Sequence, residues 1–376
     1  MDIVPINKII QGDALEELKK LPSEFVNCII TSPPYFGLRD YQVKGQLGLE
    51  KTLNEYIEKL LKITLELKRI LRKDGVMFWN HGDCYGGSGM GTWKNPPKKI
   101  NSKEIYHIPY GSNVPTRKNR EMAKCLMLQN WRLILRMIDE QGWILRNTII
   151  WNKPNAMPSS VKDRFANKYE PVFMLVKNKK YWFDLDAVRI PHNPYPNKRG
   201  FANETEYRIW IRSQKQYDLS GTSPTQKWAD SPKFNYRVRD AEKKSEQCPQ
   251  FKASKEEIER YKKETGKIKG GGANLNLPYF TNPKGKNPGD VWEISTHPCP
   301  KDFRGVHFAM FPEKLIEPMV LAGCPKEGIV LDPFMGSGTT SVVAKKLGRK
   351  FIGIELNKDY CAIAEARIGA VPEALF

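Results

Sequence analysis

The sequence predicts an α/β protein with a mostly parallel, twisted sheet interrupted by one inserted region. Short apolar strands alternate with amphipathic helices in the first half of the chain, and the same alternation returns near its end. Between the two lies a long polar stretch without periodicity. Two predicted strands end in loops of unusual composition, one rich in proline and one rich in glycine.

The first half of the chain carries most of the predicted sheet. Residues 54–71 place Ile57, Leu60 and Leu61 on one face of a helix, and the two prolines after Thr31 prevent the preceding strand from continuing. The predicted strands are residues 3–12, 25–30, 76–79, 144–151 and 171–176, and the predicted helices are 14–21, 54–71 and 123–140.

Two basic segments interrupt this pattern. Residues 82–120 contain seven Lys and Arg residues and only two acidic residues. Loops of this length are usually functional. Residues 178–306 hold 25 Lys and Arg and 16 Asp and Glu, with aromatic residues interleaved among the charges. We interpret the second segment as a target-recognition insert.

The alternating pattern resumes after the insert. The predicted elements are helices at 312–322, 339–347 and 358–367 and strands at 329–332 and 351–355. The expected organisation is a first α/β half at 1–177 with its basic loop at 82–120, the insert at 178–306, and a second α/β half at 307–376.

The composition narrows the class of partner. The chain has 376 residues and a formal net charge of +19, which is compatible with a nucleic-acid partner, an anionic membrane, or a basic globular protein without a special partner. The apolar stretches are too short for a membrane span and the first residues do not resemble a signal peptide, so we expect a soluble protein of the cytoplasm without membrane contact. Seven scattered cysteines without Cys-x-x-Cys spacing indicate neither a disulfide framework nor a metal site.

The glycine-rich loop has the chemistry of a nucleotide-like cofactor site. The strand at 329–332 delivers Asp332 and is followed by Pro333-Phe334-Met335-Gly336-Ser337-Gly338-Thr339 at the start of a helix. Such loops let a ligand approach the main chain at the carboxyl edge of a parallel sheet. Glycine spacing excludes the dinucleotide and P-loop patterns, and Glu355 ends the next strand where it can accept hydrogen bonds from a ribose. A phosphate-free adenosine conjugate suits this combination, although Asp332 as a helix cap and the glycines as turn residues remain an alternative.

The proline-rich loop suits a planar amine. In Ser32-Pro33-Pro34-Tyr35, the serine hydroxyl and a backbone carbonyl held by the prolines can accept hydrogen bonds from an exocyclic amino group, while Tyr35 stacks on the base. Taken alone, the same residues are also compatible with a rigid turn carrying a packed aromatic ring.

Together these motifs resemble the β class of S-adenosylmethionine-dependent DNA amino-methyltransferases, the type II modification methylases, over most of the chain. Weaker similarities lie at 73–78, 149–153, 164–175, 290–292 and 307–312, and the order, with the catalytic loop first and the cofactor loop last, is that of a permuted class I Rossmann-like domain. The resemblance implies that 1–177 is the catalytic half, 178–306 the target-recognition insert and 307–376 the cofactor-binding half. It implies the catalytic residues Ser32, Pro33, Pro34 and Tyr35. It implies S-adenosyl-L-methionine as cofactor, bound by Asp13, Asp332, Phe334, Gly336, Ser337, Gly338, Thr339 and Glu355, and no metal.

The implied reaction is direct methyl transfer to the amino nitrogen of a base flipped out of double-stranded DNA. Serine at position 32 favours N4 of cytosine, since adenine-specific members more often carry Asp or Asn there; N6 of adenine stays an alternative. A carbon-5 cytosine enzyme would need a nucleophilic cysteine, and Cys248 and Cys299 follow no predicted strand. RNA or protein glutamine as substrate, and a non-catalytic DNA-binding regulator with the same fold, are further alternatives.

The expected partners follow from this reading. The first is double-stranded DNA, bound by the basic segments, and this binding would associate the protein with the nucleoid. The second is a cognate restriction endonuclease, which would act in the same system without necessarily binding this protein. Both a monomer and a homodimer are compatible with the sequence.

Overall fold

The structure is a computed structural model that describes residues 4–39, 41, 43–86, 122–156, 159, 161–191, 284–296 and 310–372. It divides the chain into two compact units, Met1–Val188 with Pro288–Phe376, and Arg189–Asn287. In the second unit, the described residues include a bridge between Ile190 and Lys286. Most of the basic loop at 82–120 and of the insert at 178–306 lies outside the described residues.

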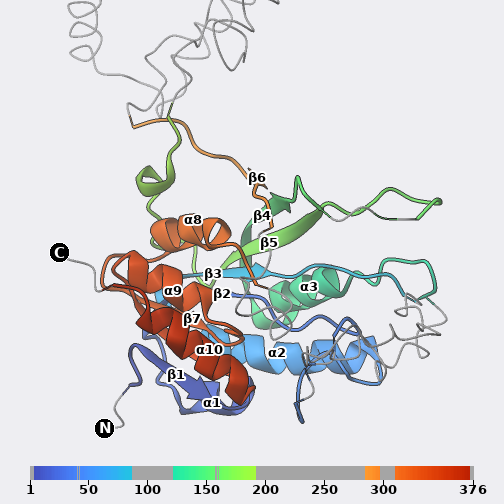
Figure 1. The fold of residues 1–376 in the computed structure, drawn as a ribbon, viewed down its shortest axis with the longest axis horizontal. Coiled ribbons are helices and arrows are strands. Elements are labelled where there is room, and N and C mark those ends of the chain that lie inside the picture. Colours follow the sequence, from blue (N-terminus) through green and yellow to red (C-terminus); the bar gives the residue numbers. More distant parts are fainter. Residues whose placement is uncertain are drawn as a thin grey trace, which may run out of the picture. The chain divides into compact units, whose positions relative to one another are not determined.

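The first unit is built on an eight-stranded sheet with the strand order β1-β8-β7-β2-β3-β5-β4-β6 (Figure 1). Among the described strands, only β5 is antiparallel to its neighbours. The sheet is therefore mostly parallel, as predicted. The strands are β1 (Lys8–Gln11), β2 (Val26–Thr31), β3 (Leu71–Asn80), β4 (Ile144–Asn152), β5 (Tyr169–Val176), β6 (Val291–Glu293), β7 (Ile329–Asp332) and β8 (Lys350–Glu355).

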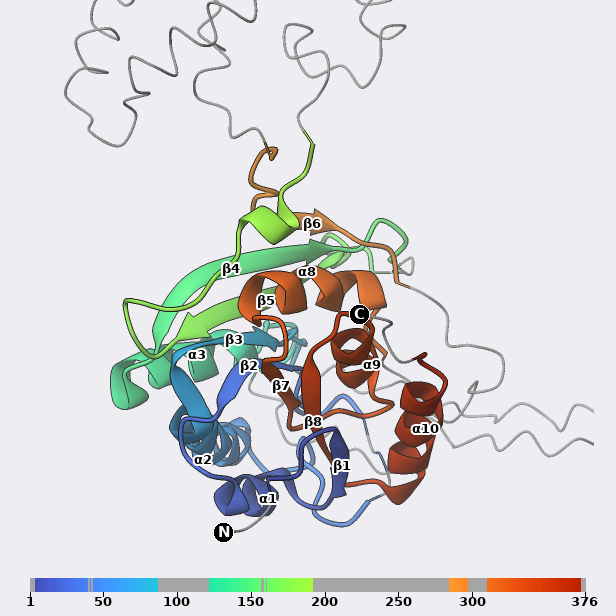
Figure 2. The ribbon, with the colours of Figure 1, turned by 90° about the vertical axis from the view of Figure 1, so that its left-hand side faces the viewer.

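Helices cover both faces of this sheet (Figure 2). One face carries α1 (Ala14–Lys20), α2 (Leu53–Ile70) and α3 (Gln129–Gln141), and the other carries α8 (Glu313–Gly323), α9 (Thr339–Lys346) and α10 (Lys358–Gly369). A short 3-10 helix, η2 (Asp186–Val188), lies against α8.

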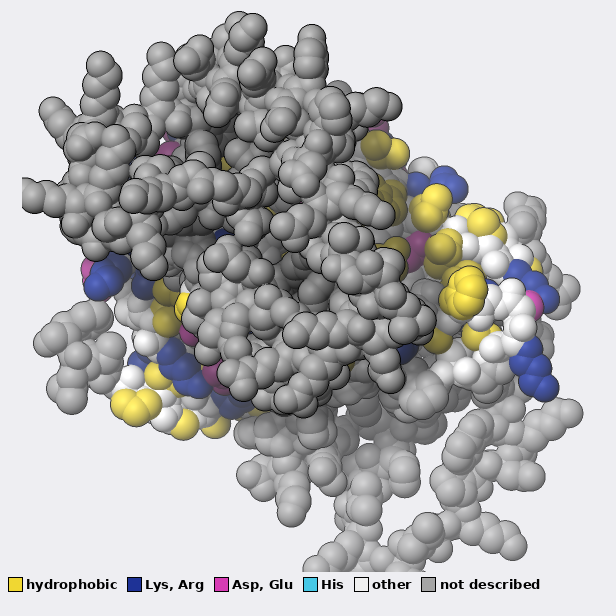
Figure 3. Space-filling view, turned by 90° about the horizontal axis from the view of Figure 1, so that it is seen from above, with side chains coloured by type: hydrophobic (Ala, Val, Ile, Leu, Met, Phe, Trp, Pro, Cys, Tyr) yellow, Lys and Arg dark blue, Asp and Glu magenta, His cyan; other side chains and the backbone are white. Residues whose placement is uncertain are grey.

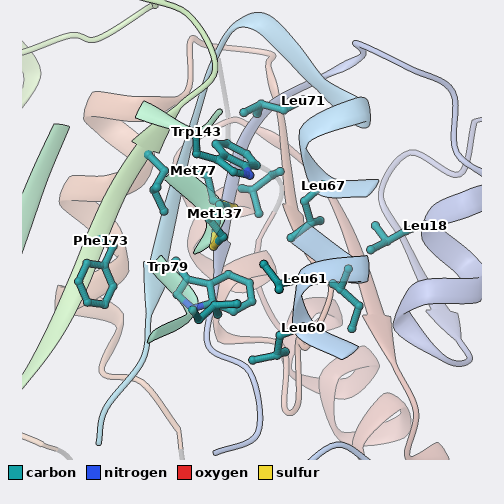
Figure 4. Close-up of a cluster of buried hydrophobic side chains, with 14 of the residues drawn as sticks. Leu18, Leu60, Leu61, Leu67, Leu71, Met77, Trp79, Met137, Trp143 and Phe173 are labelled. Atoms are coloured by element: carbon teal, nitrogen blue, oxygen red, sulfur yellow. The ribbon is translucent and has the colours of Figure 1, made fainter. Parts of the chain in front are cut away.

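The alternation of side chains along each buried strand divides the core between the two faces. Ile29 of β2 and Trp79 of β3 belong to the cluster beneath α1, α2 and α3, whereas Cys28 and Phe78 belong to the cluster beneath α8 and α9. Figure 4 shows the first cluster, with leucines of α2 facing Met77, Trp79 and Trp143. The sheet is therefore buried on both sides, as its continuous apolar strands predict.

Local sequence signals explain most element boundaries. Thr52 and Glu55 form a reciprocal capping box at the start of α2, with Glu55 N donating to Thr52 Oγ1 at 3.1 Å. Helix α3 begins at Gln129 rather than at the predicted residue 123, because the preceding segment forms bridges with Tyr85 and Gly86 and Leu128 has φ +53°. Strand β3 begins at Leu71, directly after α2, rather than at the predicted residue 76, and its pairing with β2 has a register irregularity.

Strand β6 was not predicted as a strand. It lies inside the proposed insert and extends the sheet by pairing in parallel with β4. Only three residues long, it carries no periodicity that could identify it from sequence.

Within the described ranges, no helix is long and apolar enough to cross a membrane. No group of three or more His, Cys, Asp or Glu there could hold a metal ion.

Candidate active site

A cavity of about 390 Å³ opens at the edge of the sheet where the parallel strands end. The volume lies within the ~300–1,000 Å³ typical of small-molecule sites. Because β5 is antiparallel, its first residues join this edge, beside the ends of β2, β3 and β4. The predicted site residues that line the cavity are Asp13, Ser32, Pro33, Pro34, Tyr35, Phe334, Gly336, Ser337, Thr339 and Glu355. Asp332 and Gly338 are not on its wall.

The glycine-rich loop turns sharply before α9. Gly336 and Gly338 have φ of +51° and +81°, which residues with a Cβ rarely adopt. Arg367 of α10 fixes the loop from behind: its Nη1 donates to the Ser337 carbonyl at 2.6 Å, to Ser337 Oγ at 2.9 Å and to Thr339 Oγ1 at 3.1 Å. The loop is therefore held in shape by protein contacts.

Asp332 lies behind the cavity wall, whereas the sequence placed it among the cofactor contacts. Thr31 Oγ1 and Thr340 Oγ1 each donate to its carboxylate at 2.7 Å, and Phe334 N donates at 3.1 Å. Burial raises its pKa to about 6, and these three hydrogen bonds oppose that rise. Asp332 thus connects Thr31, the residue just before Ser32, to the glycine-rich loop.

Two further acids line the cavity. Glu355 accepts hydrogen bonds from Gly336 N at 2.9 Å and from Asn357 N at 2.7 Å, and burial raises its pKa. Asp13 is exposed and is the N-cap of α1, where Oδ1 accepts from Glu16 N at 3.1 Å. Both carboxylates keep lone pairs that a ligand in the cavity can use.

On the opposite wall, Tyr35 joins the tetrapeptide at 32–35 to β3 and β5. Its hydroxyl lies 3.1 Å from Glu170 Oε2 and 3.3 Å from Asn80 Oδ1, and Ser32 Oγ donates to it at 3.4 Å. Lys153 Nζ pairs with Glu170 Oε1 at 2.5 Å. Burial raises the pKa of Tyr35 well above its ordinary value, so the phenol stays protonated. These groups form a polar pocket around Ser32.

A buried chain of hydrogen bonds supports the tetrapeptide from below. Tyr56 donates its hydroxyl proton to the Pro34 carbonyl at 2.7 Å, so it accepts from His81 Nε2 at 3.2 Å. His81 Nδ1 then accepts from Trp79 Nε1 at 3.4 Å. Burial lowers the pKa of His81 to about 3, which keeps the ring neutral. This chain fixes the Pro34 carbonyl.

Several of these residues were not found from sequence. Asn80 ends β3 and His81 follows it, as Thr31 ends β2 and Ser32 follows, and polar residues at the end of a strand are the signal that could have identified them. Tyr41, Asn357 and Tyr360 line the cavity, and Arg367 supports it, without any sequence signal that distinguishes them from surface residues.

Sequence comparison identifies relatives over almost the whole chain. The model of the DNA methylase family, which comprises N6 and N4 methyltransferases, matches residues 26–198 and 191–366. The chain is 32% identical to the type II methyltransferase M.SfiI of Streptomyces fimbriatus, over 93% of this chain and 88% of that protein. It is 33% identical to the type II methyltransferase M.SmaI of Serratia marcescens, over 96% of this chain and 90% of that protein.

The fold is also shared with a solved methyltransferase. The PvuII DNA methyltransferase (cytosine-N4-specific) superposes with a TM-score of 0.55 and 18% identity, covering 99% of this chain and 89% of that chain. This similarity confirms the Rossmann-like class I methyltransferase fold predicted from the sequence.

The cofactor of this family is S-adenosylmethionine, and the residues around the cavity fit it. Phe334 offers an apolar surface and Glu355 offers carboxylate oxygens beside the sharply turned loop that leads into α9. When bound, S-adenosylmethionine supplies an electrophilic methyl group on a sulfonium. From the match of the family model, the two type II relatives and this cavity, we conclude that the chain belongs to the family of S-adenosylmethionine-dependent DNA amino-methyltransferases.

Proposed function

We propose that this protein is a site-specific DNA methyltransferase that methylates N4 of cytosine in double-stranded DNA. The observation that carries the choice of base is Ser32, whose side chain lies on the cavity wall at the end of β2. Its oxygen can accept a hydrogen bond from an exocyclic amino group, and this aims the nitrogen lone pair toward the methyl donor. N6 of adenine is the second candidate, since the same geometry suits any planar amine.

The polar pocket gives the other residues their proposed roles. Tyr35 supplies a ring beside the flipped base, and its hydroxyl is held by Glu170 and Asn80. The Pro34 carbonyl accepts from Tyr56, and the Ser32 hydroxyl is proposed as an acceptor for the amino group. The base nitrogen forms its bond to the methyl carbon as the carbon–sulfur bond breaks, and the surplus proton leaves to water.

The basic segments at 82–120 and 178–306 are proposed to bind the phosphates and read the base edges. Together the two segments have a net charge of +14, out of the net charge of +19 of the whole chain. The proposed organisation places the first segment inside the catalytic half at 1–177, and the second between that half and the cofactor-binding half at 307–376. Because the relatives are type II methyltransferases, a cognate restriction endonuclease is the proposed functional partner in the cytoplasm.

Incubation with labelled S-adenosylmethionine and unmethylated duplex DNA tests the proposal, followed by base-resolved sequencing of the product. We expect N4-methylcytosine at one short sequence. N6-methyladenine would establish the second candidate, and DNA binding without label transfer would establish a non-catalytic regulator.

A further inference from the structure

The loop between β4 and β5 is directly continuous with the polar pocket. Lys153 follows β4 and pairs with Glu170 of β5, and Lys153 N donates to the Lys168 carbonyl at 2.7 Å. In Figure 1 this hairpin extends beyond the sheet. Phe165 is five residues from Glu170, so its Cα lies within about 18 Å of that residue.

Phe165 is 96% exposed, more than any other large hydrophobic side chain among the described residues. Phenylalanine is one of the residue types most often buried, and this ring is free to contact a partner whose chemistry matches the residues around it. The surroundings here are held by specific contacts. Asp163 pairs with Lys124 at 2.8 Å, and the Arg164 guanidinium lies 3.8 Å from the centre of the Tyr85 ring.

The charge around Phe165 selects the partner. The two acids of the loop region, Asp163 and Glu170, are each paired with a lysine. Lys162, Arg164 and Lys168 present their cationic side chains on the exposed surface. On the side of the hairpin, Figure 3 shows hydrophobic side chains lying beside Lys and Arg side chains. The cationic side chains can bind the phosphates of a nucleic acid, and the apolar ring between them can stack on its bases.

We propose that Phe165 enters the DNA base stack at the position that the target base leaves. This inference rests on the proposed function, because it requires a base to be extruded into the pocket around Ser32. Extrusion leaves a gap in the duplex, and an inserted apolar side chain replaces the lost stacking. Only five residues separate Phe165 from Glu170, which pairs with Lys153, so the wedge and the pocket lie on one hairpin.

The test compares Phe165→Ala with the wild-type protein on two substrates. One is a matched, unmethylated duplex that carries the recognition site. The other has a mismatch opposite the target base, which weakens the pairing of that base and lowers the cost of its extrusion. Because base–aromatic stacking changes affinity by roughly ten- to hundredfold, we expect kcat/KM of Phe165→Ala to fall by about that factor on the matched duplex. On the mismatched duplex we expect much of the loss to be recovered.

Two variants serve as controls. Phe165→Trp keeps a stacking ring and should retain most activity on the matched duplex, while Val161→Ala removes a partly exposed apolar group from the same loop and should leave both substrates unaffected. A fluorescent base analogue at the target position should report less extrusion with Phe165→Ala.

Equal losses on both substrates would overturn the proposal, as would unchanged activity. A shift of Phe165→Ala from dimer to monomer in sedimentation would also overturn it, by showing that the ring contacts a second copy. Failure of the proposed function is distinguishable, since the wild-type protein would then methylate neither substrate.

Discussion

Replacing Thr31 by valine removes one hydroxyl from the connection between β2 and the cofactor loop while preserving side-chain shape. The wild-type hydroxyl donates to Asp332 Oδ1 at 2.7 Å inside a fully buried site. Below pH 6 Asp332 is mostly neutral, so the lost hydrogen bond should lower the free energy of unfolding by about 1 kcal/mol. Above pH 6 Asp332 is ionised, so the substitution removes a hydrogen bond to a carboxylate. The loss in the free energy of unfolding should then grow to about 2–3 kcal/mol.

The sign of this pH dependence follows from the raised pKa of Asp332. A carboxyl with a folded pKa of about 6, against an ordinary value of 3.8, contributes stability that is complete below pH 3.8 and is lost as the pH rises through 6. The Thr31 hydroxyl lowers that pKa, so its removal should raise it further and extend the loss to higher pH. The variant should therefore be more destabilised at pH 7.5 than at pH 5.

Thermal and denaturant unfolding between pH 5 and 8 measures both effects. Thr64→Val is the matched control, because this buried threonine donates to Leu61 O and Gln141 Oε1, which do not titrate. Its destabilisation should not vary with pH. If Thr31→Val also gives a pH-independent loss, Asp332 does not ionise in contact with Thr31 and the reasoning is refuted.

Three further predictions concern the cavity. Ser32→Ala should lower kcat by roughly 100-fold with little change in cofactor affinity by calorimetry; loss of cofactor binding alone would contradict its proposed role. Gly338→Ala should weaken cofactor binding and cost about 1 kcal/mol or more, because φ is +81° and the new Cβ would lie 2.8 Å from Ala364 Cβ; Gly369→Ala, with open space around it, is the control. His81 has a lowered pKa, so its contribution to stability is present above pH 6.5 and is lost as the pH falls toward 3. His81→Gln should flatten this acid dependence in unfolding experiments.

The framework of the fold was predictable because its signals are local. Strand β7 was predicted with its observed bounds, and α1 and α2 lie within one residue of theirs, since apolar periodicity and end residues act over a few positions. The start of α3 was wrong because bridges to Tyr85 and Gly86, some 40 residues earlier, replace the first turns of the predicted helix. Such pairings leave no periodic trace in the sequence.

The site was predictable in part for the same reason. Ser32 and Glu355 were found because each stands at the end of a recognisable strand. The position of Asp332 could not be read from its motif, since one of its two hydroxyl partners, Thr31, lies 301 residues away in the sequence. Arg367 was missed because a helix-terminal arginine normally faces solvent, and only the packing of α10 turns it toward the loop.

The pairing of β1 with β8 also constrains how this protein is made. Lys8 pairs with Ile352 and Gln11 with Glu355, so an early segment of the nascent chain must wait for one synthesised more than 300 residues later. Contacts of such separation form slowly. Because Glu355 belongs to that late strand, the cofactor cavity is completed near the end of synthesis. A chain interrupted before Lys350 would carry the tetrapeptide and be unable to assemble its site.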